Sequence, residues 1–296
     1  MSGAATPKPQ AAAPADPPQA LAERAPAGGC DAHFHMVAHD FPLWEGRVED
    51  PAPGALADWA ARYRRVMARL GLSRGVVVHS ILYGADNALT AAAVAALGRE
   101  SFRGIGLVRD GADDAALDAL AAQGMAGVRL NLVHGGLLSL EGAAALGPRL
   151  AERGLHVQML VSAPVSMAAA AEAARRLPVP VVFDHLAWPD IAAGVDEPGF
   201  QALLRLVGEG RAWVKLSGVY RLCAPPWEAA DGHVAALLRA NPERCLWGTD
   251  WPHLMLGDAA RPDAGALLDA FHRVATDAET RARVLVETPA RLYGFA

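Results

Sequence analysis

The stretch GCDAHFH, residues 29–35, is a buried-looking run that carries two histidines near its end. Side chains two positions apart on a strand point to the same face, so His33 and His35 share one face while Phe34 lies on the other. Imidazole groups are costly to bury unless they are paired or have a chemical role. This stretch therefore predicts the first strand of an α/β protein, with part of a candidate active site at its carboxyl end.

Seven further apolar runs follow, and longer Ala-rich segments of helical character separate them. The predicted strands are 29–35, 75–80, 103–108, 126–132, 155–161, 180–185, 212–217 and 244–249. The predicted helices are 54–70, 87–98, 113–123, 141–153, 165–176, 198–209, 227–240 and 264–275, with a ninth near 277–286. This alternation predicts a (β/α)₈ barrel of the TIM type. The alternative is an open doubly wound sheet, which normally uses fewer strands, and no G-x-G-x-x-G follows the first strand to indicate a dinucleotide site.

Residues 1–28 are dominated by Ala and Pro and contain almost no large apolar side chain. They predict a solvated, disordered arm before a single barrel domain over residues 29–296. The chain has 296 residues, of which 52% are hydrophobic and 20% charged, so it is not disordered throughout. Its net charge of −5 gives no basic excess for binding nucleic acid or an anionic membrane.

Three cysteines, Cys30, Cys223 and Cys245, are far apart and form no C-x-x-C motif. This spacing argues against a disulfide framework or a structural zinc site, and a reducing, cytoplasmic setting is expected. No apolar run approaches the roughly 18 residues that a membrane helix needs, and the N-terminus lacks the pattern of a secretory signal. We therefore expect no membrane contact.

Polar side chains gather at the carboxyl ends of the predicted strands, where TIM barrels carry their chemistry. Arg129 and Asn131 form a second pair on one face. Asp184 is expected to face away from His185, and Lys215 fits an interior salt bridge as well as a substrate contact. The remaining candidates at or just after strand ends are His79, Ser80, His156, Gln158, Ser217, Tyr220, Arg221, Asp250 and His253.

Several segments together resemble the amidohydrolase superfamily, in particular its amidohydrolase-2 branch, which includes lactonases. The segments are CDAHFH (30–35), HSILYGADN (79–87), AGVRLNL (126–132), VVFDHLAWPD (181–190), VKLSGVYRL (214–222), LWGTDWPH (246–253) and ETPARLYGF (287–295). They occur in order from the first strand to the last helix, so the resemblance covers residues 29–296. A lone H-x-H would be weak evidence, but the ordered set is specific.

The resemblance implies a site made of His33, His35, His185 and Asp250, which hold one or two divalent metals in the wider superfamily. Binuclear members also use a carboxylated Lys or a Glu at the end of strand 4, and a His on strand 5. This chain has Arg in the strand-4 region and Gln158 on strand 5, so no binuclear centre is expected. The lactonase branch is thought to work without metal. We expect no cofactor, with one divalent metal such as Zn²⁺, held by the same four residues, as the alternative.

Opening of a lactone, an ester-type bond, in a small carboxylated substrate is the implied reaction. Asp250 would be the general base that activates water, and the three histidines would polarise the carbonyl. Arg129 and Arg221 would bind a substrate carboxylate. Residues 131–136 contain no further Arg or Lys, which puts a dicarboxylate substrate in doubt. Additional hydrogen bonds are expected from Ser80, Asn87, Asn131 and Tyr220.

Three other functions fit the same residues. A sugar-acid lactone isomerase would use the same base and the same carbonyl-polarising groups. A mononuclear metal-dependent hydrolase or decarboxylase of the superfamily is a further alternative, although Gln158 stands where a metal-binding His would be wanted. A non-catalytic, ligand-binding barrel would be expected to lack one or more of the four core residues, and all are present. The sequence gives no prediction of the oligomeric state.

Overall fold

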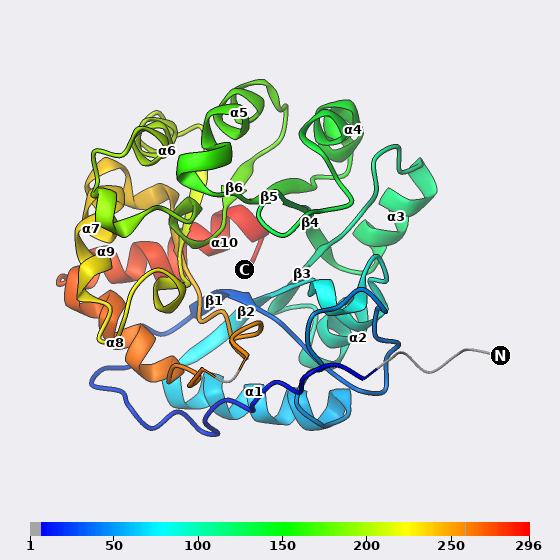
Figure 1. Ribbon diagram of the computed structural model, residues 1–296, viewed down its shortest axis with the longest axis horizontal. Helices are drawn as coiled ribbons and strands as arrows, with labels where there is room; N and C mark the ends of the chain where they lie inside the picture. The colour runs from blue at the N-terminus through cyan, green and yellow to red at the C-terminus, as the bar shows by residue number, and fades with distance from the viewer. Residues whose placement is uncertain (1–6, 258) are drawn as a thin grey trace.

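The structure is a computed structural model that describes residues 7–257 and 259–296. Within these residues, eight parallel strands pair in chain order from β1 to β8. Helices α1 to α8 surround them in the same order (Figure 1). The strands are β1 (Gly29–Phe34), β2 (Leu72–Val78), β3 (Phe102–Gly106), β4 (Met125–Asn131), β5 (His156–Leu160), β6 (Val181–Phe183), β7 (Trp213–Leu216) and β8 (Cys245–Trp247). The predicted TIM-type barrel is confirmed.

The helices lie close to their predicted positions. They are α1 (Leu56–Leu70), α2 (Ala88–Leu97), α3 (Asp114–Ala122), α4 (Leu140–Glu152), α5 (Ala163–Arg176), α6 (Pro198–Gly208), α7 (Asp231–Ala240) and α8 (Ala264–Val274). The predicted ninth helix, near 277–286, is divided into α9 (Ala278–Ala282) and the π-helix η7 (Arg283–Glu287), and a further helix, α10 (Thr288–Tyr293), follows it. Helix α7 begins four residues later than predicted, because Trp227 has a left-handed φ of 65° that interrupts the helix. None of the described helices combines the length and the apolar character that a membrane span requires.

A β-bulge in β1 determines which side chains reach the site. Asp31 pairs with Gly75 and Phe34 with Val77, so three steps on β1 match two on β2. Below the bulge, Ala32 packs in the inner core. Above it, Phe34 instead stacks against Tyr63 of α1, outside the barrel. The extra residue changes the alternation of the strand, which allows the two histidines on either side of Phe34 to face inward.

Backbone contacts between β1 and the segment after β8 close the barrel at its carboxyl end. The N–H of Asp250 donates to the carbonyl of His33 at 2.8 Å, and the N–H of His35 donates to the carbonyl of Trp251 at 2.7 Å. At the opposite end, Tyr293 and Phe295 pack into the inner core, and the C-terminus lies within the ring of helices (Figure 1). The barrel is therefore plugged at the bottom, and the polar groups at its top are held by backbone pairing.

Residues 7–28 form no helix or strand, as their composition predicts, but they contact the outside of the barrel. Asp16 pairs with Arg65 of α1, and the carboxylate of Asp263 accepts a hydrogen bond from the backbone N–H of Gln19. Figure 1 shows this segment following α1. The contacts arise because the ends of α1 and α8 present charged side chains to a segment with free backbone N–H groups. Residues 1–6 of the predicted arm lie outside the described residues.

Candidate active site

Three histidines surround one carboxylate at the carboxyl end of the barrel. The Nε2 atom of His35 lies 3.2 Å from Oδ1 of Asp250, and that of His33 lies 3.6 Å from the same oxygen. Nε2 of His185 lies 3.8 Å from Oδ2 of Asp250. All four side chains are buried. The structure thus brings together the four residues that the resemblance implied.

A strained turn aims His185 at the centre of the site. From His185 to Trp188, four consecutive residues have φ between 51° and 59°, the left-handed region that non-glycine residues rarely adopt. Asp250 shares this conformation, with φ of 57°. Non-glycine residues persist in such conformations only when their surroundings hold them there, and they occur most often at functional sites.

Asp250 is an ionised carboxylate with two strong donors. Its Oδ2 atom accepts hydrogen bonds from the Tyr220 hydroxyl at 2.6 Å and from Nε of Arg221 at 2.9 Å. Burial alone would raise the pKa of Asp250, but the charge of Arg221 holds this pKa well below its usual value. Asp250 therefore carries a negative charge at neutral pH.

Asp184 lies at the centre of a second buried network beneath the histidines. Its Oδ1 atom is 3.2 Å from Nδ1 of His33, and its Oδ2 atom accepts from Nε2 of Gln158 at 3.0 Å and from Arg129 at 3.5 Å. The prediction that Asp184 faces away from His185 and the site is wrong. Asp184 is still extended and shares the inner face with Val182, and the left-handed turn that starts at His185 brings the His185 side chain to the interior as well.

Lys215 completes this network from β7. Its Nζ atom donates to Oε1 of Gln158 at 2.6 Å, and it lies 3.3 Å from Nδ1 of His33 and 3.5 Å from Oδ1 of Asp184. Lys215 is fully buried, and burial lowers its pKa to about 8, which leaves it mostly charged at neutral pH. The interior salt-bridge interpretation is confirmed, because Lys215 is absent from the residues that line the cleft above.

Hydrogen bonds to the Nδ1 atoms orient the three rings. The Val78 carbonyl can only accept, so Nδ1 of His35, at 2.8 Å, carries a proton. Nδ1 of His185 lies 2.9 Å from the hydroxyl of Ser217, which can donate to it and so leave the proton of a neutral ring on Nε2. Burial lowers the pKa of His185 to about 4, so this ring is neutral at pH 7.

Asp31 fixes β1 to β8 behind the site. Its carboxylate accepts hydrogen bonds from the backbone N–H and the hydroxyl of Thr249, from Tyr63 at 3.0 Å and from the N–H of His33 at 3.1 Å. Burial raises the pKa of Asp31 to about 6, against the effect of the Thr249 hydrogen bonds. Asp31 thus positions His33 and, through Thr249, the neighbouring Asp250.

The donor set also fits a single divalent cation. Ligand atoms of His33, His185 and Asp250 lie within 4.8 Å of one another. His33 Nε2 and Asp250 Oδ1 are buried and have no hydrogen-bond partner among the described residues. Nitrogen and carboxylate ligands of this kind suit zinc. Arg221, which already neutralises Asp250, and Lys215 beside His33 are positive charges that oppose a further cation.

A cleft opens over these groups and contains most of the predicted substrate-binding residues. It is lined by His35, Ser80, Ile81, Arg129, Asn131, His134, Leu160, His185, Trp188, Arg221, Asp250, Leu254 and Met255. Tyr220 is not among them and instead contacts Asp250. Asn87 is elsewhere, since its side-chain amide donates to the Leu107 carbonyl and accepts from the Leu107 N–H at 2.8 and 2.7 Å. Its expected role in substrate binding therefore has no geometric support.

Besides four apolar residues, the cleft contains His134 and Trp188, neither of which is among the predicted site residues. Each follows a strand end by a few positions, in a loop whose path the sequence pattern did not define. The indole ring of Trp188 lies 6.0 Å from the rings of both His134 and His185. The position of these loops just after β4 and β6 was the available signal.

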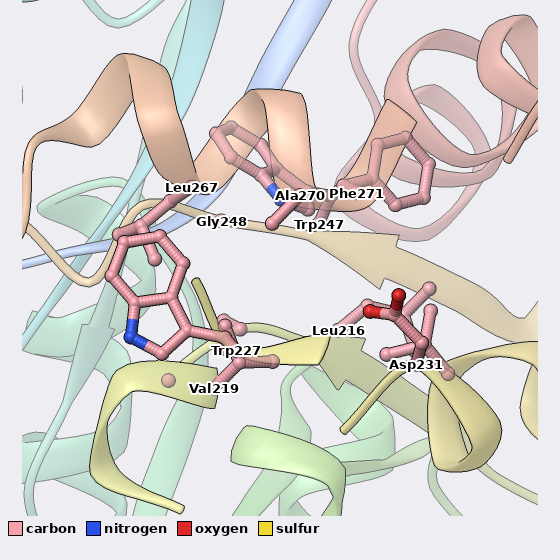
Figure 2. Close-up of a pocket in the computed structure, with 12 residues that line it drawn as sticks. Leu216, Val219, Trp227, Asp231, Trp247, Gly248, Leu267, Ala270 and Phe271 are labelled. Carbon is pink, nitrogen blue, oxygen red and sulfur yellow. The ribbon is translucent and has the colours of Figure 1, made fainter. Parts of the chain in front are cut away.

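A second hollow lies on the outer side of β7 and β8, against α7 and α8 (Figure 2). Its lining is mainly apolar and includes Trp227, Trp247 and Phe271. Asp231 is the titratable residue among the described residues that line it, and it forms an ion pair with Arg273. Of the candidate residues, Ser217 lines this hollow, but His33, His35, His185 and Asp250 do not, so the chemistry belongs to the cleft at the barrel mouth.

Known proteins resemble this chain over almost its whole length. It is 33% identical over 283 residues to a 2-pyrone-4,6-dicarboxylate hydrolase of Comamonas testosteroni, with 90% of each chain covered. It is 33% identical over 279 residues to a 4-sulfomuconolactone hydrolase of Rhizobium radiobacter, with 91% of each covered. A D-galactarolactone isomerase of Agrobacterium fabrum is 31% identical over 276 residues, which cover 90% of this chain and 91% of the isomerase.

A solved structure of a probable 2-pyrone-4,6-dicarboxylic acid hydrolase from Acinetobacter baumannii superposes with a TM-score of 0.81. It is 23% identical and covers 90% of this chain and 100% of its own, so it supports the fold. The amidohydrolase family model matches residues 30–295, from the first strand to the penultimate residue of the chain. On the fold, the site and these matches, the chain belongs to the amidohydrolase family.

Proposed function

We propose that this protein is a lactonase, which hydrolyses the ester-type bond of a small carboxylated lactone. The observation that carries the proposal is one cleft lined by two kinds of group. His35, His185 and the ionised Asp250 line it, and the guanidinium groups of Arg129 and Arg221 line it as well. His33 lies 3.6 Å from Asp250. The names of two relatives, both lactone-ring or pyrone hydrolases, support the same reaction class.

In the proposed reaction, Asp250 accepts a proton from a water molecule while the water oxygen attacks the lactone carbonyl carbon. Negative charge moves to the carbonyl oxygen, where the Nε2–H group of His185 stabilises it. The tetrahedral intermediate then collapses and the ring C–O bond breaks. Asp250 returns its proton to the departing oxygen, so one water is consumed and a ring-opened acid is formed.

Arg129 and Arg221 bind the substrate carboxylate in this proposal. Guanidinium and carboxylate groups match in geometry and charge, so the pair orients the ring and contributes to specificity. Arg129 has an Nε–H group that is buried and has no partner among the described residues. A bound carboxylate would give this group an acceptor.

We propose that the reaction needs no metal, because the histidines can polarise an ester carbonyl with a good leaving oxygen. If a divalent ion were held by His33, His185 and Asp250, it would supply Lewis-acid polarisation of the carbonyl. Metal analysis of protein prepared without added metal separates the two possibilities. Near-stoichiometric zinc that is lost together with activity on chelation would contradict the metal-free proposal.

An isomerase is the second candidate, and the relative named as a D-galactarolactone isomerase favours it. In that reaction a hydroxyl of the substrate, rather than water, would attack the carbonyl.

We further propose a cytoplasmic, catabolic setting, which the three free cysteines support, since each of them is without a disulfide.

The test is a screen of pyrones, muconolactones and aldarolactones, with and without a chelator. Product analysis distinguishes a ring-opened acid from an isomeric lactone. Asp250→Asn should abolish turnover of whichever lactone is found, while the control Asp196→Asn, at an exposed position, should not. Turnover retained in Asp250→Asn would refute the assignment of the base.

A further inference from the structure

Two guanidinium groups, those of Arg129 and Arg221, line the cleft. His134, which is exposed, also lines it, and desolvation, followed by the charges of Arg129 and Arg221, lowers its pKa. His134 is therefore uncharged at neutral pH and adds no third cation. The remaining donors of the two arginines are partly used, because Arg129 also contacts Asp184 and Arg221 contacts Asp250. The two arginines therefore fit one anionic group.

Trp188 lies near both His134 and His185 in the same cleft. Its ring centroid lies 6.0 Å from that of His134 and 6.0 Å from that of His185. A flat lactone ring that packs against the indole would have its carbonyl near His185 and its acid near His134. Packing of a planar unsaturated ring on an indole face is favourable.

The rest of the lining is uncharged. Ile81, Leu160, Leu254 and Met255 supply apolar surface. The polar side chains beside them are neutral, and each accepts a backbone hydrogen bond while keeping its own donor hydrogens. Ser80 Oγ accepts from the N–H of Leu82. Asn131 Oδ1 accepts from the N–H groups of Val133 and His134.

No further Lys or Arg lines the cleft among the residues that the structure describes. Lys215 lies beneath it and is engaged by Gln158 and Asp184. A second carboxylate on the substrate would therefore meet apolar side chains and neutral donors without a cation, which is unfavourable for a buried charge. A hydrogen or methyl group at the same position would instead bury apolar surface.

We propose that the substrate is an unsaturated lactone with a single anionic group, bound between Arg129 and Arg221, and an otherwise uncharged ring that packs on Trp188 and the apolar wall. This inference rests on the proposed lactonase function and specifies its substrate class. It separates this chain from its 33% identical relative, whose name specifies a dicarboxylate.

Matched pyrones test the proposal directly. The value of kcat/KM is measured for 2-pyrone-6-carboxylate, 2-pyrone-4-carboxylate and 2-pyrone-4,6-dicarboxylate with the full-length protein. We expect at least one monocarboxylate to exceed the dicarboxylate by tenfold or more. A dicarboxylate that is opened as fast as both monocarboxylates, or faster, would overturn the proposal.

Binding of inert ring acids gives an answer that does not depend on turnover. We expect 3-methylbenzoate to bind at least tenfold more tightly than isophthalate, which carries a second carboxylate in place of the methyl group. Tighter binding of isophthalate would overturn the charge argument. If no pyrone is opened while 3-methylbenzoate still binds preferentially, the lactonase proposal fails and the single-anion cleft stands.

A charge-gain variant provides the internal comparison. Met255→Lys adds a cation at the apolar wall, and Met255→Gln has similar length without charge. The ratio of the Kd for isophthalate to the Kd for 3-methylbenzoate should be at least fivefold smaller in Met255→Lys than in Met255→Gln. An unchanged ratio would show that this wall does not meet the second substituent, against the proposal.

Discussion

Removal of the Lys215 ammonium tests the buried network beneath the histidines. Lys215→Met keeps the length of the side chain but deletes the charge 3.5 Å from Asp184. Asp184 would retain Gln158 and the more distant Arg129, at 3.0 and 3.5 Å. Breaking a fully buried ion pair by removing one partner costs about 3–5 kcal/mol, and the partners that remain place the expected loss near the lower limit, about 3 kcal/mol.

A double-mutant cycle makes this estimate specific. Asp184→Asn alone leaves the Lys215 cation without its partner, and the double variant Lys215→Met/Asp184→Asn removes both charges. We expect the double variant to be about 2 kcal/mol more stable than the sum of the two single losses predicts. Urea unfolding at pH 7, followed by tryptophan fluorescence, measures all four proteins.

Additive losses would refute the reasoning, because they would mean that Lys215 and Asp184 do not stabilise each other. Activity provides a second measurement, since Nδ1 of His33 contacts both residues. We expect kcat to fall more than tenfold in each single variant, with little change in KM. A rise in KM alone would instead indicate direct contact of Lys215 with the substrate.

Three further perturbations test other parts of the account. Arg129→Met should raise KM for a carboxylated lactone about 10- to 100-fold, with a smaller effect on kcat. The reason is that a charge-assisted hydrogen bond contributes about 1.5–3 kcal/mol. Steady-state kinetics measure both constants, with Arg205→Met on α6 as the control variant. Thr249→Val should lower the free energy of unfolding by about 1–3 kcal/mol, because it leaves the buried Asp31 without one hydrogen-bond donor. Thr249→Ser keeps the hydroxyl and should retain most of this free energy. Equal losses in the two variants would contradict the role of the hydroxyl. His156 is buried, and burial lowers its pKa from 6.5 to about 3, so the folded state favours the neutral ring. As the pH falls below 6.5, the ring becomes protonated in the unfolded state alone, and the free energy of unfolding decreases. From pH 7 to pH 5 this loss is about 2 kcal/mol. Urea unfolding at several pH values measures it, and His156→Gln should lose less stability over this range than the unmodified protein. The same pH dependence in both proteins would refute the contribution of His156.

The sequence was sufficient for the barrel because its signals are local and repeated. Short apolar runs and Ala-rich helical segments alternate along the whole chain, and each predicted strand overlaps an observed one. The placement of His33 and His35 on the inner face also followed from the two-residue period of a strand. The bulge that makes this placement possible depends on pairing with β2, which no local pattern reports.

Site residues outside regular strands were harder to predict. Asp184 was misplaced because strand alternation was extended into a left-handed turn that the residue types give no reason to expect. Asn87 looked available for a ligand, yet the backbone of Leu107 occupies its amide. His134 and Trp188 enter the cleft through loop paths set by tertiary packing. Periodicity therefore predicts which face a strand residue occupies, but not where a loop carries its side chains.

Hydrolysis in ¹⁸O-labelled water tests the central claim most directly. If Asp250 activates water against a lactone carbonyl, the ring-opened product should carry one ¹⁸O in its new carboxylate, and Asp250→Asn should form no such product. Mass spectrometry of the product measures both. An unlabelled product, such as an isomeric lactone, or labelled product formed at an undiminished rate by Asp250→Asn, would contradict the account.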